Sequence, residues 1–174
     1  MDRKSFYVLK KLSRGRHIPF VVMIFMVACS ESNQKSRAQE KQELISRIER
    51  VFQEKEPAWK VDSSYAHDGQ SIVFRSEEGQ AAVEVSIWKR EKDAKQDFAA
   101  HSLSLDNTWG KSMGTVKNTL PNLGDENHIW TLPDSEAWPM IRFRKGKVNI
   151  DIFAPSVTIA KRFAQHVLEQ LPTT

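Results

Sequence analysis

The sequence contains a single cysteine, Cys29, among its 174 residues. One cysteine excludes an intramolecular disulfide and any site built from paired thiolates. The chain also lacks the Gly-x-Ser-x-Gly turn of serine hydrolases, a phosphate-binding loop and the glycine fingerprint of dinucleotide-binding proteins. We therefore expect an apolar core alone to hold the domain. We also predict a protein without catalytic activity and without a cofactor.

Long apolar runs are missing as well. The run from Ile18 to Ala28 has about half of the roughly 20 residues that a helix needs to cross a bilayer. A basic segment precedes it, and this order of charged then apolar residues is typical of a secretory signal peptide. Residues 1–28 are therefore predicted to be a signal peptide and not a membrane-spanning helix. The basic residues of this segment are Arg3, Lys4, Lys10, Lys11, Arg14 and Arg16.

The apolar run ends in Met26-Val27-Ala28-Cys29. This tetrapeptide resembles the lipobox of bacterial lipoproteins, although Leu is commoner than Met at its first position. The resemblance covers the first 29 residues and implies that signal peptidase II cuts before Cys29. It also implies a diacylglyceryl group on the Cys29 sulfur, an acyl chain such as palmitate on its amine, and anchoring in the cell envelope facing the periplasm. The alternative is an ordinary signal peptide that contains a cysteine.

Removing the signal peptide changes the charge of the chain. The whole sequence has a net charge of +4. Residues 1–28 carry six Lys or Arg and one Asp, which leaves 20 basic and 21 acidic residues and a net charge of −1. The remaining chain therefore lacks the basic character of a nucleic-acid-binding protein.

The expected partners of the chain are the membrane, an envelope protein or a small ligand. An Asp at position 30 would resemble the signal for inner-membrane retention. The residue there is Ser30, which favours the outer membrane of a Gram-negative cell.

The rest of the chain predicts a flexible tether followed by one globular domain. Residues 30–40 hold no apolar side chain larger than Ala, so the lipidated Cys29 and these residues form the predicted tether, 29–40. The domain is predicted over 41–174 and begins with an amphipathic helix over 41–54. Alternating and helical patterns then predict strands at 71–76, 82–89, 127–132, 140–144 and 147–153, helices at 91–105 and 156–171, and a loop with one short strand over 106–125. The last two strands form a predicted hairpin, with Ser156 as the predicted cap of the helix that follows. The polar side chains of this hairpin, on the face opposite Ile141 and Phe143, are Arg142, Arg144, Asn149 and Asp151.

These elements predict the α+β class, with helices packed on an antiparallel sheet in a two-layer or three-layer sandwich. Two segments also resemble each other, each with the order strand, glycine turn, strand, helix. Ile72-x-Phe74-Arg75 is matched by Ile141-x-Phe143-Arg144, and Ala94 and Phe98 by Ala160 and Phe163. A duplicated β-β-α unit whose two helices cover one face is one interpretation, and chance similarity of two amphipathic units is the other.

The domain weakly resembles the PsbP-like α/β sandwich of lumenal and periplasmic proteins. Gly124-Asp125-Glu126 before a strand, followed by Phe143-Arg144-Lys145-Gly146-Lys147-Val148 and a closing helix, also resembles uncharacterised bacterial lipoprotein domains over about residues 120–171. Those domains are regarded mostly as binding or accessory modules. They share no catalytic set that maps onto this chain.

Asp125, Glu126 and His128 form the best candidate for a metal or acid–base cluster. Glu126 and His128 share one side of a strand, but a zinc site needs four ligands. A polar turn at the start of a strand is the alternative. Trp109 and Trp138 lie in predicted loops, where an aromatic ring with a polar edge can bind a partner.

The sequence therefore predicts a lipid-anchored envelope protein whose domain binds a small ligand or a protein. A metal-dependent envelope hydrolase using Asp125, Glu126 and His128 is one alternative. A purely structural envelope component is the other.

Overall fold

The computed structural model describes residues 21–62 and 71–172, with side chains described from residue 36. The chain divides into two compact units, residues 1–36 and 37–174. The folded domain is the second unit. Most of the predicted signal peptide and residues 63–70 lie outside the described residues, and Cys29 lies where only the backbone is described.

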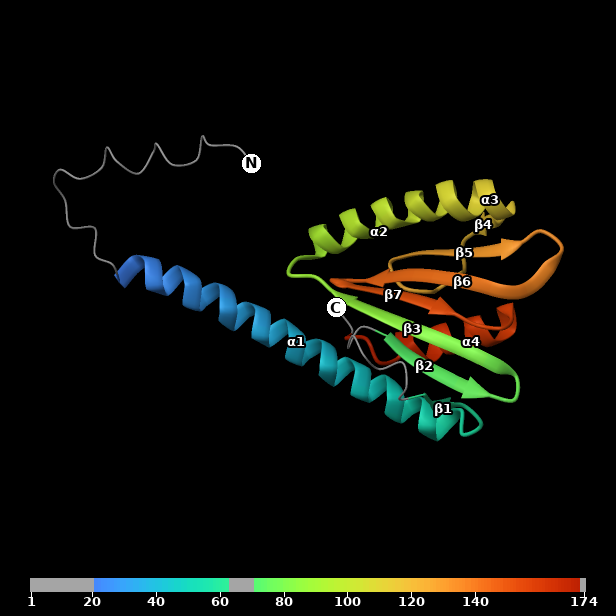
Figure 1. Ribbon diagram of the computed structural model, residues 1–174, viewed down its shortest axis with the longest axis horizontal. Coiled ribbons are helices and arrows are strands. Elements are labelled where there is room, and N and C mark those ends of the chain that lie inside the picture. The colour runs from blue at the N-terminus through green and yellow to red at the C-terminus, as the bar shows by residue number, and fades with distance from the viewer. Residues whose placement is uncertain (1–20, 63–70, 173–174) are drawn as a thin grey trace, which may run out of the picture. The chain divides into compact units, whose positions relative to one another are not determined.

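One seven-stranded antiparallel sheet forms the middle of the domain, in the order β1-β2-β3-β7-β6-β5-β4 (Figure 1). The strands are β1 (Lys60–Val61), β2 (Ser71–Ser76), β3 (Gly79–Ile87), β4 (Val116–Asn118), β5 (Glu126–Leu132), β6 (Ser135–Lys145) and β7 (Val148–Phe153). The helices are α1 (Val21–Lys55), α2 (Glu91–Leu105), α3 (Lys111–Met113) and α4 (Val157–Leu168), and a π-helical turn, η2 (Asp106–Gly110), joins α2 to α3. The predicted α+β class is confirmed.

Helix α1 begins earlier than the sequence predicts. Its end at Lys55 agrees with the predicted helix over 41–54, but residues 29–40, predicted as a flexible tether, are helical. This stretch contains no Pro or Gly and is rich in Gln, Lys, Arg, Ala and Glu, which favour helix even without an apolar face. The tether prediction considered burial alone and overlooked this propensity.

The first face of the sheet carries the main apolar core. Leu44, Ile48 and Phe52 of α1 and Phe163 and Val167 of α4 are at most 2% exposed. They belong to one cluster with the inward side chains of the strands, which are Ile72, Phe74, Val83, Val85, Ile129, Ile141, Phe143, Val148, Ile150 and Ile152. Ser156 caps α4 as predicted, because its hydroxyl accepts a hydrogen bond from the Ile159 amide at 3.3 Å.

The opposite face of the sheet carries buried polar side chains beside a small apolar cluster that includes Trp130 and Met140. Arg142, Arg144, Asn149 and Asp151 alternate with the core residues of β6 and β7, as the sequence predicts, and each is at most 7% exposed. Helix α2 covers them, since Asp97 pairs with Arg142 and the Ala94 carbonyl accepts from Asn149. The domain therefore has three layers, with α1 and α4 on one face and α2 on the other.

The two predicted β-β-α units agree in their strands and differ in their helices. Val85 of β3 pairs with Ile150 of β7. On either side of this central pair, Val83 pairs with Ile152 and Ile87 pairs with Val148. These pairings relate the hairpin β2–β3 to the hairpin β6–β7 by a local two-fold axis. The prediction that both helices cover one face is wrong, because α2 lies on the Arg142 side and α4 on the Ile141 side. The similarity between the units does not extend to the placement of their helices.

Candidate functional site

The predicted acidic residues are held by a buried arginine. Glu126 Oε1 accepts hydrogen bonds from Arg144 Nε at 3.1 Å and Nη2 at 3.0 Å. Asp125 Oδ2 lies 3.1 Å from Arg144 Nη1 and accepts from the Gly146 amide at 2.7 Å. Both carboxylates thus neutralise a guanidinium that is 4% exposed and fix the turn before β5.

His128 faces α2, on the same side of β5 as Glu126, as predicted. Its ring lies 5.4 Å from Phe98 and 5.5 Å from Trp130, centroid to centroid. Burial and the nearby Lys117 lower the pKa of His128, against the opposing effect of Asp106 and Glu126. In the part of the chain with described side chains, no three His, Cys, Asp or Glu residues are placed to hold a metal ion.

The two predicted binding tryptophans lie in different surroundings. Trp109 is half-buried in η2 and contacts the small cluster of Leu105, Trp130 and Met140, with its ring 6.1 Å from that of Phe153. Trp138 is 63% exposed in β6. Its φ of 52° is in the left-handed region, and its amide donates to the Pro155 carbonyl at 3.2 Å. Trp109 is therefore part of a core cluster, and Trp138 presents its ring to solvent.

The charges under α2 form a network around Arg142, which is 1% exposed. Arg142 Nη1 donates to Asp151 at 2.5 Å, and Nη2 donates to Asp97 at 2.7 Å. Asn149 Nδ2 donates to the same oxygen of Asp97 at 2.8 Å. Burial raises the pKa of Asp151 to about 6, although Arg142 opposes the rise. The network joins α2 to the sheet. Structural ion-pair networks also perturb pKa values, so the raised pKa of Asp151 does not by itself mark a catalytic site.

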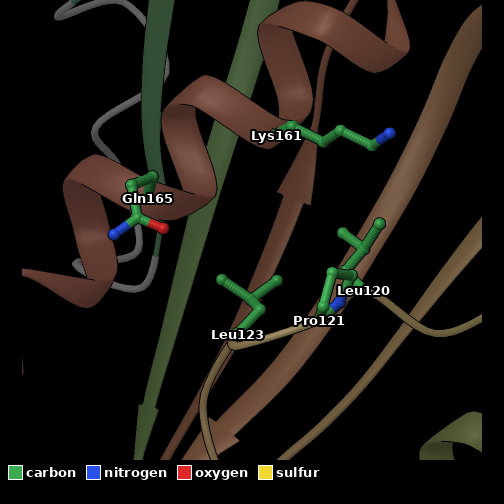
Figure 2. A pocket seen from close by; sticks show the side chains of 5 residues that line it. All are labelled: Leu120, Pro121, Leu123, Lys161 and Gln165. Atoms are coloured by element: carbon green, nitrogen blue, oxygen red, sulfur yellow. The ribbon is translucent and has the colours of Figure 1, made fainter.

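A pocket opens on the other face, between α4 and the connection from β4 to β5 (Figure 2). Its volume is about 230 Å³. Leu120, Pro121 and Leu123 line it from the connection, and Lys161 and Gln165 line it from α4. Because residues four apart share one side of a helix, Lys161 and Gln165 present neighbouring polar groups to the pocket.

Asn127 holds the apolar wall of this pocket in place. Its side-chain oxygen accepts from the Leu120 amide at 2.7 Å, and its side-chain nitrogen donates to the carbonyls of Leu120 at 3.0 Å and Leu123 at 2.8 Å. Gly124, with a φ of 70°, brings the connection against the backbone of Arg144. One amide side chain thus fastens both ends of the loop that forms the wall.

Sequence reasoning did not identify this pocket. Leu120, Pro121 and Leu123 are the signal that could have found its wall, since they are apolar residues in an otherwise polar loop. Lys161 belongs to the helix predicted over 156–171, and no local sequence pattern indicates that it faces a cavity.

Comparison with known proteins gives no relative for this chain. No protein family, characterised protein or solved structure matched it. Within the described residues, no helix combines the length and the apolar character needed to cross a membrane.

Proposed function

We propose that this protein is a lipid-anchored protein of the bacterial cell envelope whose domain binds a small ligand or a partner protein and catalyses no reaction. The observation that carries the proposal is Met26-Val27-Ala28-Cys29, at the end of a short apolar run that follows basic residues. Cys29 is then the lipidated first residue of the mature chain. Ser30 favours the outer membrane as its destination in a Gram-negative cell.

The physics of lipid anchoring is consistent with this proposal. Each buried methylene contributes about 0.8 kcal/mol, and a single acyl chain holds a protein only reversibly. A diacylglyceryl group on sulfur and an acyl chain on the amine together give a stable hold. The domain therefore needs no membrane-spanning segment to stay at the membrane.

The binding role is supported by the pocket between α4 and the β4–β5 connection. It combines apolar walls with polar groups at its edge, which is the usual composition of small-ligand sites. Asp125 and Glu126, in contrast, form ion pairs with Arg144. The metal-dependent hydrolase considered from the sequence therefore has no complete ligand set among the described side chains. No particular observation favours a purely structural role.

The anchor is tested by metabolic labelling with a palmitate analogue in bacteria that produce the wild-type chain or Cys29→Ser. We expect labelled wild-type protein in the membrane fraction and no label on Cys29→Ser. Unlabelled, uncleaved wild-type chain in the soluble fraction would contradict the proposal.

The binding role is tested separately, in two ways. Crosslinked envelopes are isolated under denaturing conditions to recover a specific partner, and the native protein is purified to recover a retained small molecule. One of the two is the expected result. A measured turnover of an envelope substrate, without any bound partner or ligand, would replace the binding role with a catalytic one.

A further inference from the structure

We propose that the pocket between α4 and the β4–β5 connection binds a small amphiphilic carboxylate, with the apolar part of the ligand against Leu120, Pro121 and Leu123 and its carboxylate at Lys161. The inference rests on the binding role proposed above and names the class of ligand. Figure 2 shows the arrangement, with Lys161 and Gln165 on α4 and the three apolar side chains opposite them on the connection.

The size of the pocket limits the ligand to a small molecule. Its volume of about 230 Å³ is below the roughly 300–1,000 Å³ of sites for drug-sized ligands. The walls contributed by the β4–β5 connection are a proline and two leucines, and Leu123 is only 5% exposed. Such walls favour a short aliphatic or compact aromatic group, because burial of apolar surface supplies the binding energy.

The charge at the pocket edge favours an anion. Lys161 forms no ion pair with any described residue, whereas the next residue, Arg162, pairs with Glu56 at 2.6 Å. Glu169, one turn beyond Gln165, forms an ion pair with Lys55 at 2.6 Å. The ammonium of the exposed Lys161 offers three hydrogen-bond donors and no acceptor, so it can pair with an anionic oxygen at the pocket edge.

The single lysine at the pocket favours a ligand with one negative charge over a phosphate group. A phosphate ester carries about −1.5 to −2 charges at neutral pH, and Lys161 is the only cation among the residues that line the pocket. A carboxylate carries one charge and has two oxygens. One of these oxygens can accept a hydrogen bond from the Lys161 ammonium.

The wall is preorganised, which lowers the cost of binding. Three hydrogen bonds from Asn127 fix the connection at Leu120 and Leu123, and α4 is fixed by the main core. A ligand therefore need not order the loop when it enters, and less of the interaction energy is lost to conformational entropy.

The test uses the full-length chain in phosphatidylcholine nanodiscs, with empty nanodiscs as the blank, and saturation-transfer-difference NMR with hexanoate and hexanol. We expect hexanoate to bind about twofold to fivefold more tightly than hexanol to the wild type, as expected for one ion pair at an exposed lysine. Lys161→Met should remove this preference and leave hexanol binding unchanged. Lys95→Met, which removes an exposed lysine on α2, should bind both compounds as the wild type does.

Equal binding of the two compounds by the wild type, or an unchanged preference in Lys161→Met, would overturn the proposal. Displacement of hexanoate by inorganic phosphate would also overturn it, since it would assign the site to phosphate. A second variant, Leu120→Asn at a half-buried position of the apolar wall, should weaken hexanoate and hexanol alike. If hexanoate does not bind but crosslinking still recovers a partner, the proposed class of ligand is wrong and the proposed binding role is retained.

Discussion

At the scale of single residues, Asp151 is a carboxyl group whose ionisation opposes folding. It is 7% exposed, and burial raises its pKa to about 6 even though Arg142 is its direct partner. The unfolded value is about 3.9. Between these two pH values the folded state holds a proton that the unfolded state has lost. The stability from this proton is therefore fully present below about pH 3.9 and is lost as the pH rises through about 6.

We expect Asp151→Asn to remove this pH dependence. As the pH rises from about 4 to about 7, the unfolding free energy of the wild type should fall by on the order of 2–3 kcal/mol relative to that of Asp151→Asn. Urea unfolding at a series of pH values measures the difference. The charged and titratable groups around Asp151, which are Glu84, Asp97, His101 and Arg142, are present in both proteins.

The histidines act in the opposite direction. Burial lowers the pKa of His101 and of His128, so the stability associated with each is present above about pH 6.5 and is lost on acidification. The comparison with Asp151→Asn cancels this contribution. Parallel curves for the two proteins between about pH 4 and 7 would contradict the role given to Asp151.

The tryptophans provide a second prediction at this scale. Trp130 is 1% exposed and its indole donates to Asp106 at 2.8 Å, so Trp130→Ala should cost about 3–5 kcal/mol of unfolding free energy.

Trp138 is exposed and has a left-handed backbone. In Trp138→Gly, relief of about 1–2 kcal/mol of strain is offset by about 0.5–1 kcal/mol of glycine entropy. Chemical denaturation should show a change below about 1 kcal/mol for Trp138→Gly, and a larger loss would mean that its ring is packed.

At the scale of elements, the turn from the β4–β5 connection into β5 depends on Gly124. A Cβ added there would lie 2.4 Å from the Arg144 carbonyl oxygen, and its φ is 70°. Gly124→Ala should therefore cost about 2–4 kcal/mol, from overpacking and from the left-handed conformation. It should also weaken hexanoate binding, because Leu123 and its loop must move.

Gly110→Ala is the matched control for this prediction. Gly110 has helical dihedrals, and nothing lies within 4 Å of an added Cβ. Helix propensity then favours Ala by up to about 1 kcal/mol. Thermal unfolding of both variants distinguishes the two sites, and equal stability of the two would contradict the close approach at Gly124.

The sequence predicted the elements that depend on local patterns. The hairpin β6–β7 and the cap at Ser156 agree with the structure, because alternation and capping are properties of neighbouring residues. The helical turns η2 and α3 were expected as loop, since the segment from Asp106 to Gly114 is polar and contains two glycines. The pocket could not be predicted, because it requires Asn127 to fold the connection back and α4 to lie beside it. The Asn127 contacts span only four to seven residues and the packing of α4 is long-range, but neither leaves a periodic pattern in the sequence.

At the scale of the whole domain, the two faces of the sheet are held by different forces. Helix α4 buries Ile159, Ala160, Phe163, Ala164 and Val167 in the main core. Helix α2 depends partly on ion pairs of Asp97 with Arg142 and of Glu91 with Arg144, and the Glu91 side chain is 64% exposed. Local opening of α2 returns these charges to water, which recovers part of the energy lost when the pairs separate.

We therefore expect α2 to open more readily than α4. Hydrogen exchange followed by mass spectrometry should show faster exchange for peptides of residues 91–105 than for peptides of residues 157–168, under conditions where exchange reports the opening equilibrium. Equal protection of the two helices would indicate that the domain opens as one cooperative unit.

The order of the strands has a consequence for crowding. The proposed lipid anchor on Cys29 would confine the chains to two dimensions, so that copies of this protein would collide often at the membrane surface. The outermost strands of the described sheet, β1 and β4, are only two and three residues long, and each carries an exposed lysine, Lys60 and Lys117. Short, charged borders offer little template for another chain to extend the sheet. The fold is therefore suited to crowding without amyloid-like association at the edges of the sheet.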